Sequence, residues 1–386
     1  MFNVVLLGLV SFLTDASSEM VYPLVPLYLT AIGAGPGVLG LIEGLAESTA
    51  SLLKVFSGYI ADRFRRRKPL AIAGYAGSPF GKLFIAASTA WPLVFLGRLL
   101  DRFGKGVRTA PRDALLAESA DPARRGFTYG LHRAMDTAGA VVGTGLAILL
   151  LSRLGAKDPA SFRTVFLWSL VPAVAGVILL FFVREAKPDG KSLAKKLSLQ
   201  WSALDRRLKA FLVVTFLFTL GNSSNMFLLR RAEEILGAHH ALNPVVGTLW
   251  LYLAYNVVYS VVSLPAGMLS DRIGRKALLV AGYLFYGLVY FGFALVKAPA
   301  TLWWLFGAYG VYIGLTEGVE KALVADVAPP HLRATMIGLH ATLVGIGLFP
   351  ASLLAGFLWQ TFGAAAPFYF GGALGLLAAA GLALVI

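Results

Sequence analysis

Residues 267–276 read GMLSDRIGRK, and residues 58–63 carry a related stretch, GYIADR. Each stretch lies between two long apolar segments, and their starting points differ by 267 − 58 = 209 residues. Two further blocks repeat at nearly the same offset, namely 17–20 with 223–226 and 115–132 with 323–340. A fixed period of this kind indicates a duplicated structural unit. The chain is therefore predicted to consist of two related halves.

The chain is unusually apolar. Of its 386 residues, 58% are hydrophobic and only 14% are charged, with a mean hydropathy of +0.74, whereas soluble domains carry roughly 25% charged residues. Many segments stay apolar for about 20 residues, enough for a helix to cross a bilayer. The sequence predicts an all-α integral membrane protein with twelve transmembrane helices. The expected spans are residues 4–30, 37–61, 69–89, 92–117, 125–152, 163–183, 208–235, 243–270, 277–297, 300–326, 333–360 and 365–386.

The net charge of +14 does not indicate nucleic-acid binding, because the basic residues cluster in every second connection between spans. This is the pattern of the positive-inside rule, and it places both termini in the cytoplasm; residues 153–163 are an exception. The chain contains no cysteine, which excludes disulfides and thiolate metal sites. Asp15 and Glu19 interrupt the first apolar segment, which is therefore expected to be a helix and not a signal peptide.

One long polar stretch, residues 184–207, lies near the middle of the chain and is rich in lysine. We expect it to be a cytoplasmic linker between an N-terminal six-helix bundle, residues 1–183, and a C-terminal six-helix bundle, residues 208–386. Part of it is suited to lie on an anionic membrane surface.

GMLSDRIGRK at 267–276 resembles the signature loop between the second and third helices of each half in the major facilitator superfamily. The first copy departs from that pattern after Arg63, where Phe64 and Arg65 follow. The resemblance implies two six-helix bundles around a central cavity, with alternating access by rocking, and hence a secondary transporter with no cofactor, not an enzyme. In the loops, an Asp beside arginines can bind a neighbouring helix end, so we expect a conformational latch; alternatively, the arginines only enforce topology. The expected latch residues are Asp62, Arg63, Asp271 and Arg272.

Ionisable residues inside spans are costly and indicate function by default. They are concentrated in the N-terminal half: Asp15 and Glu19 share a face of the first span, and the span 92–117 carries seven charges. At the repeat positions of Asp15 and Glu19 stand Gly221 and Asn225. The N-terminal half is therefore the predicted seat of ion coupling.

The stretch from Arg102 to Arg108 resembles the signature of proton-coupled members of the superfamily, with Lys105 in place of glutamine and Arg108 in place of a small residue. The resemblance implies that Arg102 lies beside a carboxylate, for which Asp15, Glu19 and Glu47 are the candidates. Alternatively, these charges form structural pairs. The predicted coupling and cavity residues are Asp15, Glu19, Glu47, Arg102, Lys105, Arg108, His132, Arg133 and Asp136.

Gly130, Gly139 and Gly143 are spaced like the antiporter signature of the fifth helix, although Thr144 replaces its proline. This resemblance favours export, and close helix packing is the alternative.

The sequence thus predicts a proton-coupled exporter (an antiporter) of a small solute in the bacterial inner membrane, with protons and the lipid bilayer as partners and a monomer sufficient. Basic residues in the cavity favour an anionic or zwitterionic solute, while the acidic ones favour a cation. A divalent metal ion or metal chelate is the alternative substrate, for which His132 and Asp136 form half a site, together with Asp15 and Glu19. A membrane sensor or lipid-processing enzyme is disfavoured because neither a nucleotide-binding loop nor a paired nucleophile and base is present.

Overall fold

The computed structural model describes residues 2–64, 67–119, 125–155, 158–185, 206–239, 243–327 and 333–385. Within these ranges, the side chains of some residues are not described, among them the predicted site residues Asp62, Arg63, Arg133 and Asp271. Most of the predicted linker 184–207 also lies outside the described residues.

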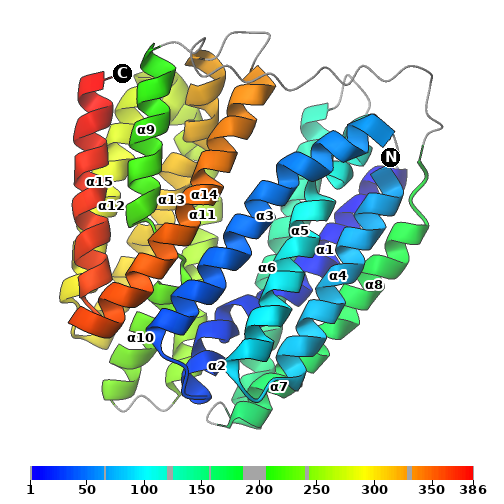
Figure 1. Cartoon of the computed structure of the whole chain (residues 1–386), viewed down its shortest axis with the longest axis horizontal. Coiled ribbons are helices and arrows are strands. Elements are labelled where there is room, and N and C mark those ends of the chain that lie inside the picture. The colour runs from blue at the N-terminus through cyan, green and yellow to red at the C-terminus, as the bar shows by residue number, and fades with distance from the viewer. Residues whose placement is uncertain are drawn as a thin grey trace. The chain divides into compact units, whose positions relative to one another are not determined.

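Every described element is a helix (Figure 1). The first half contains α1 (Phe2–Val21), η1 (Tyr22–Leu24), α2 (Val25–Ala31), α3 (Pro36–Phe64), α4 (Arg67–Ala87), α5 (Trp91–Ser119), α6 (Arg125–Leu154), α7 (Pro159–Trp168) and α8 (Leu170–Phe181). The second half contains α9 (Arg206–Gly221), α10 (Met226–Ala238), α11 (Pro244–Ile273), α12 (Arg275–Leu295), α13 (Pro299–Val327), α14 (Arg333–Phe362) and α15 (Ala366–Val385). The prediction of an all-α fold is confirmed.

Three predicted spans are interrupted helices. In 4–30 the short 3₁₀ helix η1 holds Pro23, which has no N–H to continue the α-helical ladder. In 163–183 the break at Ser169 lies just before Pro172, whose ring would clash with the carbonyl four residues earlier. In 208–235 the break covers residues 222–225, Asn-Ser-Ser-Asn, whose side chains compete for backbone hydrogen bonds. Hydropathy alone does not reveal such breaks.

Nine stretches of the described chain are long and apolar enough to cross a membrane. The three remaining predicted spans are occupied by α3, α5 and α13, which are equally long at 29 residues each. Their composition differs because α3 and α5 carry several charges, while α13 is rich in tryptophan, tyrosine and glycine. Polar residues are tolerated in spanning helices that face a protein interior.

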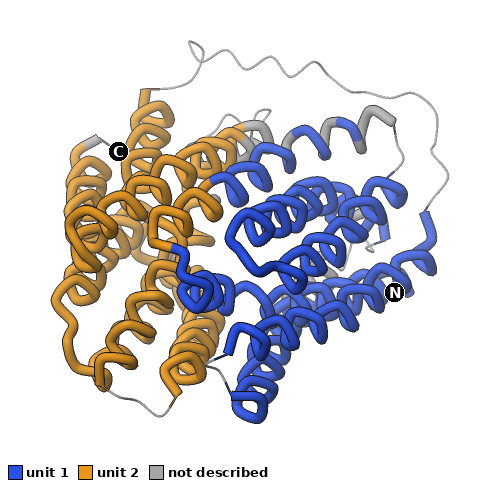
Figure 2. The backbone as a smooth tube through the Cα atoms, turned by 60° about the horizontal axis from the view of Figure 1, so that its bottom comes forward, with its two compact units in different colours: residues 1–34, 45–197 blue, residues 35–44, 198–386 orange. Residues whose placement is uncertain are grey.

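The chain divides into two compact units, residues 1–34 with 45–197 (unit 1) and residues 35–44 with 198–386 (unit 2) (Figure 2). In unit 1, α4 packs on α5, α1 on α6, and α8 on both α1 and α4. In unit 2, α12 packs on α13, α9 on α14, and α15 on both α9 and α12. These pairs correspond through the sequence repeat, so the duplication extends to the packing of the helices.

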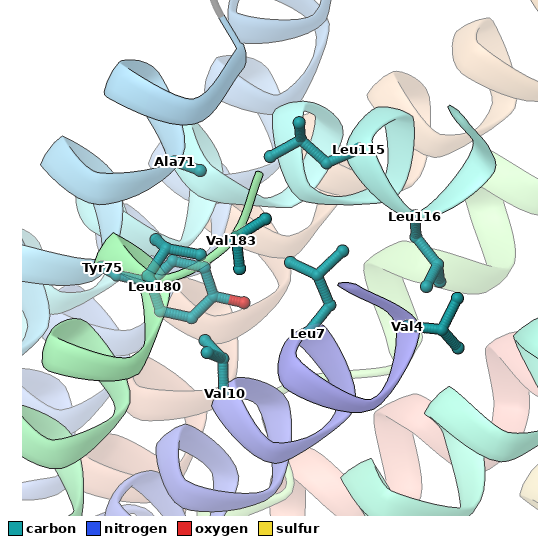
Figure 3. Packing of buried hydrophobic residues seen from close by; sticks show 9 residues of the cluster. All are labelled: Val4, Leu7, Val10, Ala71, Tyr75, Leu115, Leu116, Leu180 and Val183. Carbon is teal, nitrogen blue, oxygen red and sulfur yellow. The ribbon is translucent and has the colours of Figure 1, made fainter. Parts of the chain in front are cut away.

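An apolar cluster in unit 1 joins α1, α4, α5 and the end of α8 (Figure 3). Leu7, Val10, Tyr75, Leu115 and Leu180 are among its buried members, with at most 2% of each exposed. Burying side chains of this size contributes about 1.5–3 kcal/mol each in water, and inside a membrane close packing takes over that role. The cluster holds α5, which carries most of the buried charges, against α1.

The signature loop of unit 2 forms a tight turn between α11 and α12. Gly274 has a φ of 90°, a backbone conformation that favours glycine. Beyond the turn, Arg275 Nη1 donates to the Ala322 carbonyl at 2.6 Å, and Lys276 Nζ donates to the Ala383 carbonyl at 2.9 Å. Cations at helix C-termini are favourable, so this loop ties α12 to α13 and α15.

Candidate functional site

One face of α5 carries a ladder of cations. Arg98, Arg102, Lys105, Arg108 and Arg112 follow at intervals of four, three, three and four residues, which places them on one side of a helix. With a rise of about 1.5 Å per residue, the ladder is about 21 Å long, most of the thickness of a hydrocarbon core. So many cations in a membrane require counter-charges.

The first part of the ladder is neutralised by two carboxylates. Glu47 of α3 lies 3.3 Å from Arg102 and 3.9 Å from Arg98, while Asp101 lies 3.7 Å from each arginine. Asp101 also accepts a hydrogen bond of 2.5 Å from the Ser78 hydroxyl of α4. Buried ion pairs of this kind are stable only when further hydrogen bonds satisfy their remaining atoms.

The ring of Tyr22 in η1 completes this part of the network. The guanidinium carbons of Arg98 and Arg102 lie 5.4 and 5.5 Å from its centroid, within the range of a cation–π contact. The side chains of the two arginines are 2% and 5% exposed, whereas that of Glu47 is 26% exposed. Glu47 is therefore the accessible member of a network whose cations are buried.

The next part of the ladder faces a pair of carboxyl groups. Asp15 of α1 and Asp136 of α6 are close enough to interact, and Lys105 and Arg108 are the cations that act on Asp15. Two carboxylates at one site repel each other when both are ionised. Both residues are partly exposed.

Close packing of α1 on α6 brings the two carboxyl groups together. Gly139 lies against the Phe12 carbonyl and Gly143 against the Ala16 carbonyl, and neither position has room for a Cβ atom. Asp15 lies between these contacts on α1, and Asp136 lies one turn before Gly139. These contacts support the interpretation that the glycines allow close packing of the two helices. The same packing brings the carboxyl pair together.

Three of the predicted site residues remain, namely Glu19, His132 and Arg133. His132 is buried and Glu19 is partly exposed. The Arg133 side chain is outside the described part of the chain. Of the three carboxylates considered for Arg102, Glu47 lies 3.3 Å from it, while Lys105 and Arg108 act on Asp15.

Several buried charged residues were not among the predicted site residues. Arg98 and Asp101 belong to the same network as Arg102, and Lys82 of α4 donates to Ser17 Oγ at 2.5 Å and to Ser18 Oγ at 3.3 Å. In unit 2, Glu43 is fully buried and accepts a hydrogen bond from Ser224 at 3.3 Å. The signal that could have found them is their position inside apolar spans, since each is costly there.

Unit 2 contributes tyrosines and asparagines at the break between α9 and α10. Tyr309 donates to Asn225 Oδ1 at 2.6 Å, Asn225 Nδ2 donates to the Tyr255 hydroxyl at 3.3 Å, and Asn222 Nδ2 donates to the Tyr312 hydroxyl at 3.2 Å. The three tyrosines also contact one another, at centroid distances of 5.4–5.7 Å.

The predicted latch is only partly described. Arg272 is exposed, and the side chains of Asp62, Arg63 and Asp271 lie outside the described residues. In the loop of unit 2, Arg275 and Lys276 contact neighbouring helix ends. Neither was among the predicted latch residues.

Each of the two helical units buries polar residues inside long apolar helices. The family model of the Major Facilitator Superfamily matches residues 7–248 and again 211–386. The chain therefore belongs to this superfamily and is a membrane transporter, not an enzyme.

The relatives agree with this assignment. The chain is 40% identical over 359 residues to an uncharacterized MFS-type transporter of Methanocaldococcus jannaschii, a match that covers 93% of this chain and 88% of the relative. It is 24% identical to sugar efflux transporter B of Salmonella typhimurium, covering 94% of this chain and 90% of that protein. Among solved structures, the nucleoside transporter NupG superposes with a TM-score of 0.79 at 13% identity, covering 100% and 99% of the two chains.

Proposed function

We propose that this transporter exports a small solute in exchange for protons, by alternating access. The observation that carries the proposal is the Asp15–Asp136 pair, two partly exposed carboxyl groups that lie close together beside Lys105 and Arg108. When the pair loses its proton, a second negative charge appears next to these cations. This added charge alters the balance of positive and negative charge along the whole ladder. In this way protonation can drive a conformational change.

The ladder gives the predicted residues distinct roles. Asp15 and Asp136 bind the proton, while Lys105 and Arg108 respond to its loss. Glu47 and Arg102 form the neighbouring pair, at 3.3 Å, and a charged group of the solute can compete for either partner. His132, Arg133 and Glu19 are proposed to line the path of the solute.

The direction of transport rests on the relatives. The Salmonella relative is named as a sugar efflux transporter, and export is the activity that its name states. The glycines of α6 agree with the antiporter resemblance, although their contacts with α1 also account for them. A metal substrate has no comparable support, because among the described residues no three histidine, aspartate or glutamate side chains lie close enough to hold a metal ion.

The proposed setting is the bacterial inner membrane, with both termini in the cytoplasm. The absence of cysteine makes this easy to test, because a single introduced cysteine is the only thiol. In intact cells, a membrane-impermeant maleimide should label T361C at the exposed end of α14 and should label K187C only after permeabilisation. The reverse result would invert the topology.

The decisive experiment uses purified protein in liposomes with an imposed pH gradient and a pH-sensitive dye inside. Drugs, sugars, organic anions, amino acids and divalent metals are added in turn. The proposal expects proton movement that depends on one class of solute, that is lost in Asp15→Asn, and that persists in Asp113→Asn, whose carboxylate is half exposed. Solute flux without any proton movement in the unmodified protein would overturn the proposal.

A further inference from the structure

A second group of buried titratable side chains lies in unit 2. His340 Nε2 of α14 lies 3.7 Å from Glu320 Oε2 of α13, and the hydroxyl of Tyr283 on α12 donates to Glu320 Oε1 at 2.9 Å. His340 is 5% exposed and Tyr283 is fully buried. Three helices thus converge on one carboxylate.

The geometry around His340 suits a group that gains and loses a proton. A distance of 3.7 Å exceeds a hydrogen bond but lies within an ion pair, and the imidazole attracts the carboxylate only when it carries a proton. Phe211 of α9 stacks on the ring at 5.8 Å with an interplanar angle of 10°. The stacking fixes the imidazole plane, and the tyrosine fixes the other oxygen of the carboxylate.

Other titratable groups lie on the helices around the pair. α13 also carries Glu317, which accepts a hydrogen bond of 2.6 Å from Tyr259 of α11. α9 contributes the uncharged Phe211, and the side chain of Lys321 lies outside the described part. A proton on His340 adds a positive charge beside the carboxylate of Glu320.

The sequence repeat shows that this arrangement belongs to unit 2. The positions 208 residues earlier hold Arg112 and His132 in place of Glu320 and His340. The histidine is present in both halves, whereas the carboxylate is replaced by a cation in unit 1. Both halves therefore contain ionisable groups within their helices, but with different chemistry.

We propose that Glu320, His340 and Tyr283 form a second proton-binding site of the transporter, in unit 2. When the imidazole of His340 takes up a proton from water, it forms an ion pair with Glu320 and so links α14 to α13. When the proton is released, this ion pair is lost. The proposal builds on the proton-coupled function above and adds a proton acceptor in the half for which the sequence predicted none. It makes the packing of α13 on α14 depend on protonation.

The test follows the protonation of His340 directly and needs no transported solute. The chain has five histidines, so the imidazole signals of ¹⁵N-histidine-labelled protein can be followed by NMR between pH 5 and pH 9. His340→Gln assigns the signal. We expect His340 to titrate in this range, with a proton affinity that falls about tenfold in Glu320→Gln and rises about threefold in Tyr283→Phe, because the freed carboxylate oxygen then attracts the imidazolium more strongly.

Matched controls come from the same unit. Glu234 lies on α10, and His239 directly follows that helix. Neither belongs to the proposed site, so His239→Asn and Glu234→Gln should leave the His340 titration unchanged. Melting temperatures confirm folding, and if Glu320→Gln does not fold, Tyr283→Phe decides alone. A His340 signal that stays in one protonation state, or an affinity that changes less than twofold in every folded variant, would overturn the site. The liposome assay judges the proposed function separately, since it does not report on His340.

Discussion

Glu47 of α3 and Arg102 of α5 form an ion pair between two helices in the buried network of unit 1, at 3.3 Å from Oε1 to Nε. The pair connects the helix that begins at Pro36 with the charged ladder of α5. Because Arg98 and Asp101 lie in the same network, a change at either partner affects all four side chains.

The first prediction concerns this pair. Glu47→Gln leaves Arg102 with Asp101 at 3.7 Å, and Arg102→Ala leaves Glu47 with Arg98 at 3.9 Å. Each variant should lose most proton-driven transport, and the effects on stability should be non-additive by about 0.5–3 kcal/mol, as for residues in one network. A double-mutant cycle of thermal or denaturant unfolding measures this coupling.

The control for the first prediction is the Arg112–Asp113 pair at the other end of the ladder. It is shorter, at 2.8 Å, but Asp113 is half exposed, and exposed pairs contribute only about 0–1 kcal/mol. Asp113→Asn should therefore change stability little. Additive effects of Glu47→Gln and Arg102→Ala would mean that the two residues act independently.

The second prediction concerns the contact of α6 with α1. Gly143→Ala places a Cβ against the Ala16 carbonyl, which pushes the helices apart at the level of the Asp15–Asp136 pair. Overpacking of this kind costs about 1–3 kcal/mol, so the melting temperature should fall together with proton coupling. Unfolding of the purified variant and the liposome dye assay measure the two effects.

Gly145 provides the matched control on the same helix, since nothing lies within 4 Å of a Cβ at that position. Gly145→Ala should be neutral or should stabilise the protein by up to about 1 kcal/mol, because alanine favours helix over glycine. Equal effects of the two substitutions would show that α1 does not approach α6 as closely as the structure indicates.

The sequence was sufficient to predict an all-helical membrane protein and its superfamily, because apolar length and an internal repeat are properties of the chain itself. It left open which carboxylate meets Arg102. Asp15, Glu19 and Glu47 are all spaced to face an interior, and the choice among them depends on how α1 and α3 rotate against α5. That rotation is set by packing contacts such as the one between Gly143 and Ala16, which join residues far apart in sequence.

Glu320 and His340 illustrate the same limit in unit 2. They lie on different helices. His340 ends the repeated block 323–340, but Glu320 lies outside that block, so the sequence did not indicate that the two side chains meet. The interruptions at Pro23, Ser169 and residues 222–225 were not predicted from the sequence, because a helix with one broken turn keeps the hydropathy of an unbroken span.

The third prediction concerns the turn after α11. Gly274 has a φ of 90°, so Gly274→Ala forces a side chain into a left-handed conformation, at a cost of about 1–2 kcal/mol. The turn positions Arg275 on the Ala322 carbonyl, and its distortion should lower the melting temperature. Gly318→Ala, in a helix with open space around it, should not. A Gly274→Ala variant as stable as the unmodified protein would argue against this backbone conformation.

The last prediction concerns the break between α9 and α10. Tyr309 is buried, and its hydroxyl donates to Asn225 Oδ1 at 2.6 Å, while Asn225 Nδ2 donates to Tyr255. Tyr309→Phe removes only the hydroxyl, so the ring contacts with Tyr255 and Tyr312 remain. A hydrogen bond of this kind contributes about 0.5–1.5 kcal/mol, and an acceptor left unsatisfied costs about 1–3 kcal/mol.

If the tyrosines and Asn225 only hold the break in shape, Tyr309→Phe should lower stability by that amount and leave solute affinity unchanged. If they bind the solute, the variant should also weaken solute binding by about tenfold, because the hydroxyl that hydrogen-bonds the solute has been removed. Melting temperature and equilibrium binding of the solute found in the liposome assay separate the two effects. Tyr369→Phe, an exposed tyrosine of α15, should change neither. A change in affinity would indicate a solute that forms hydrogen bonds to the groups of this break.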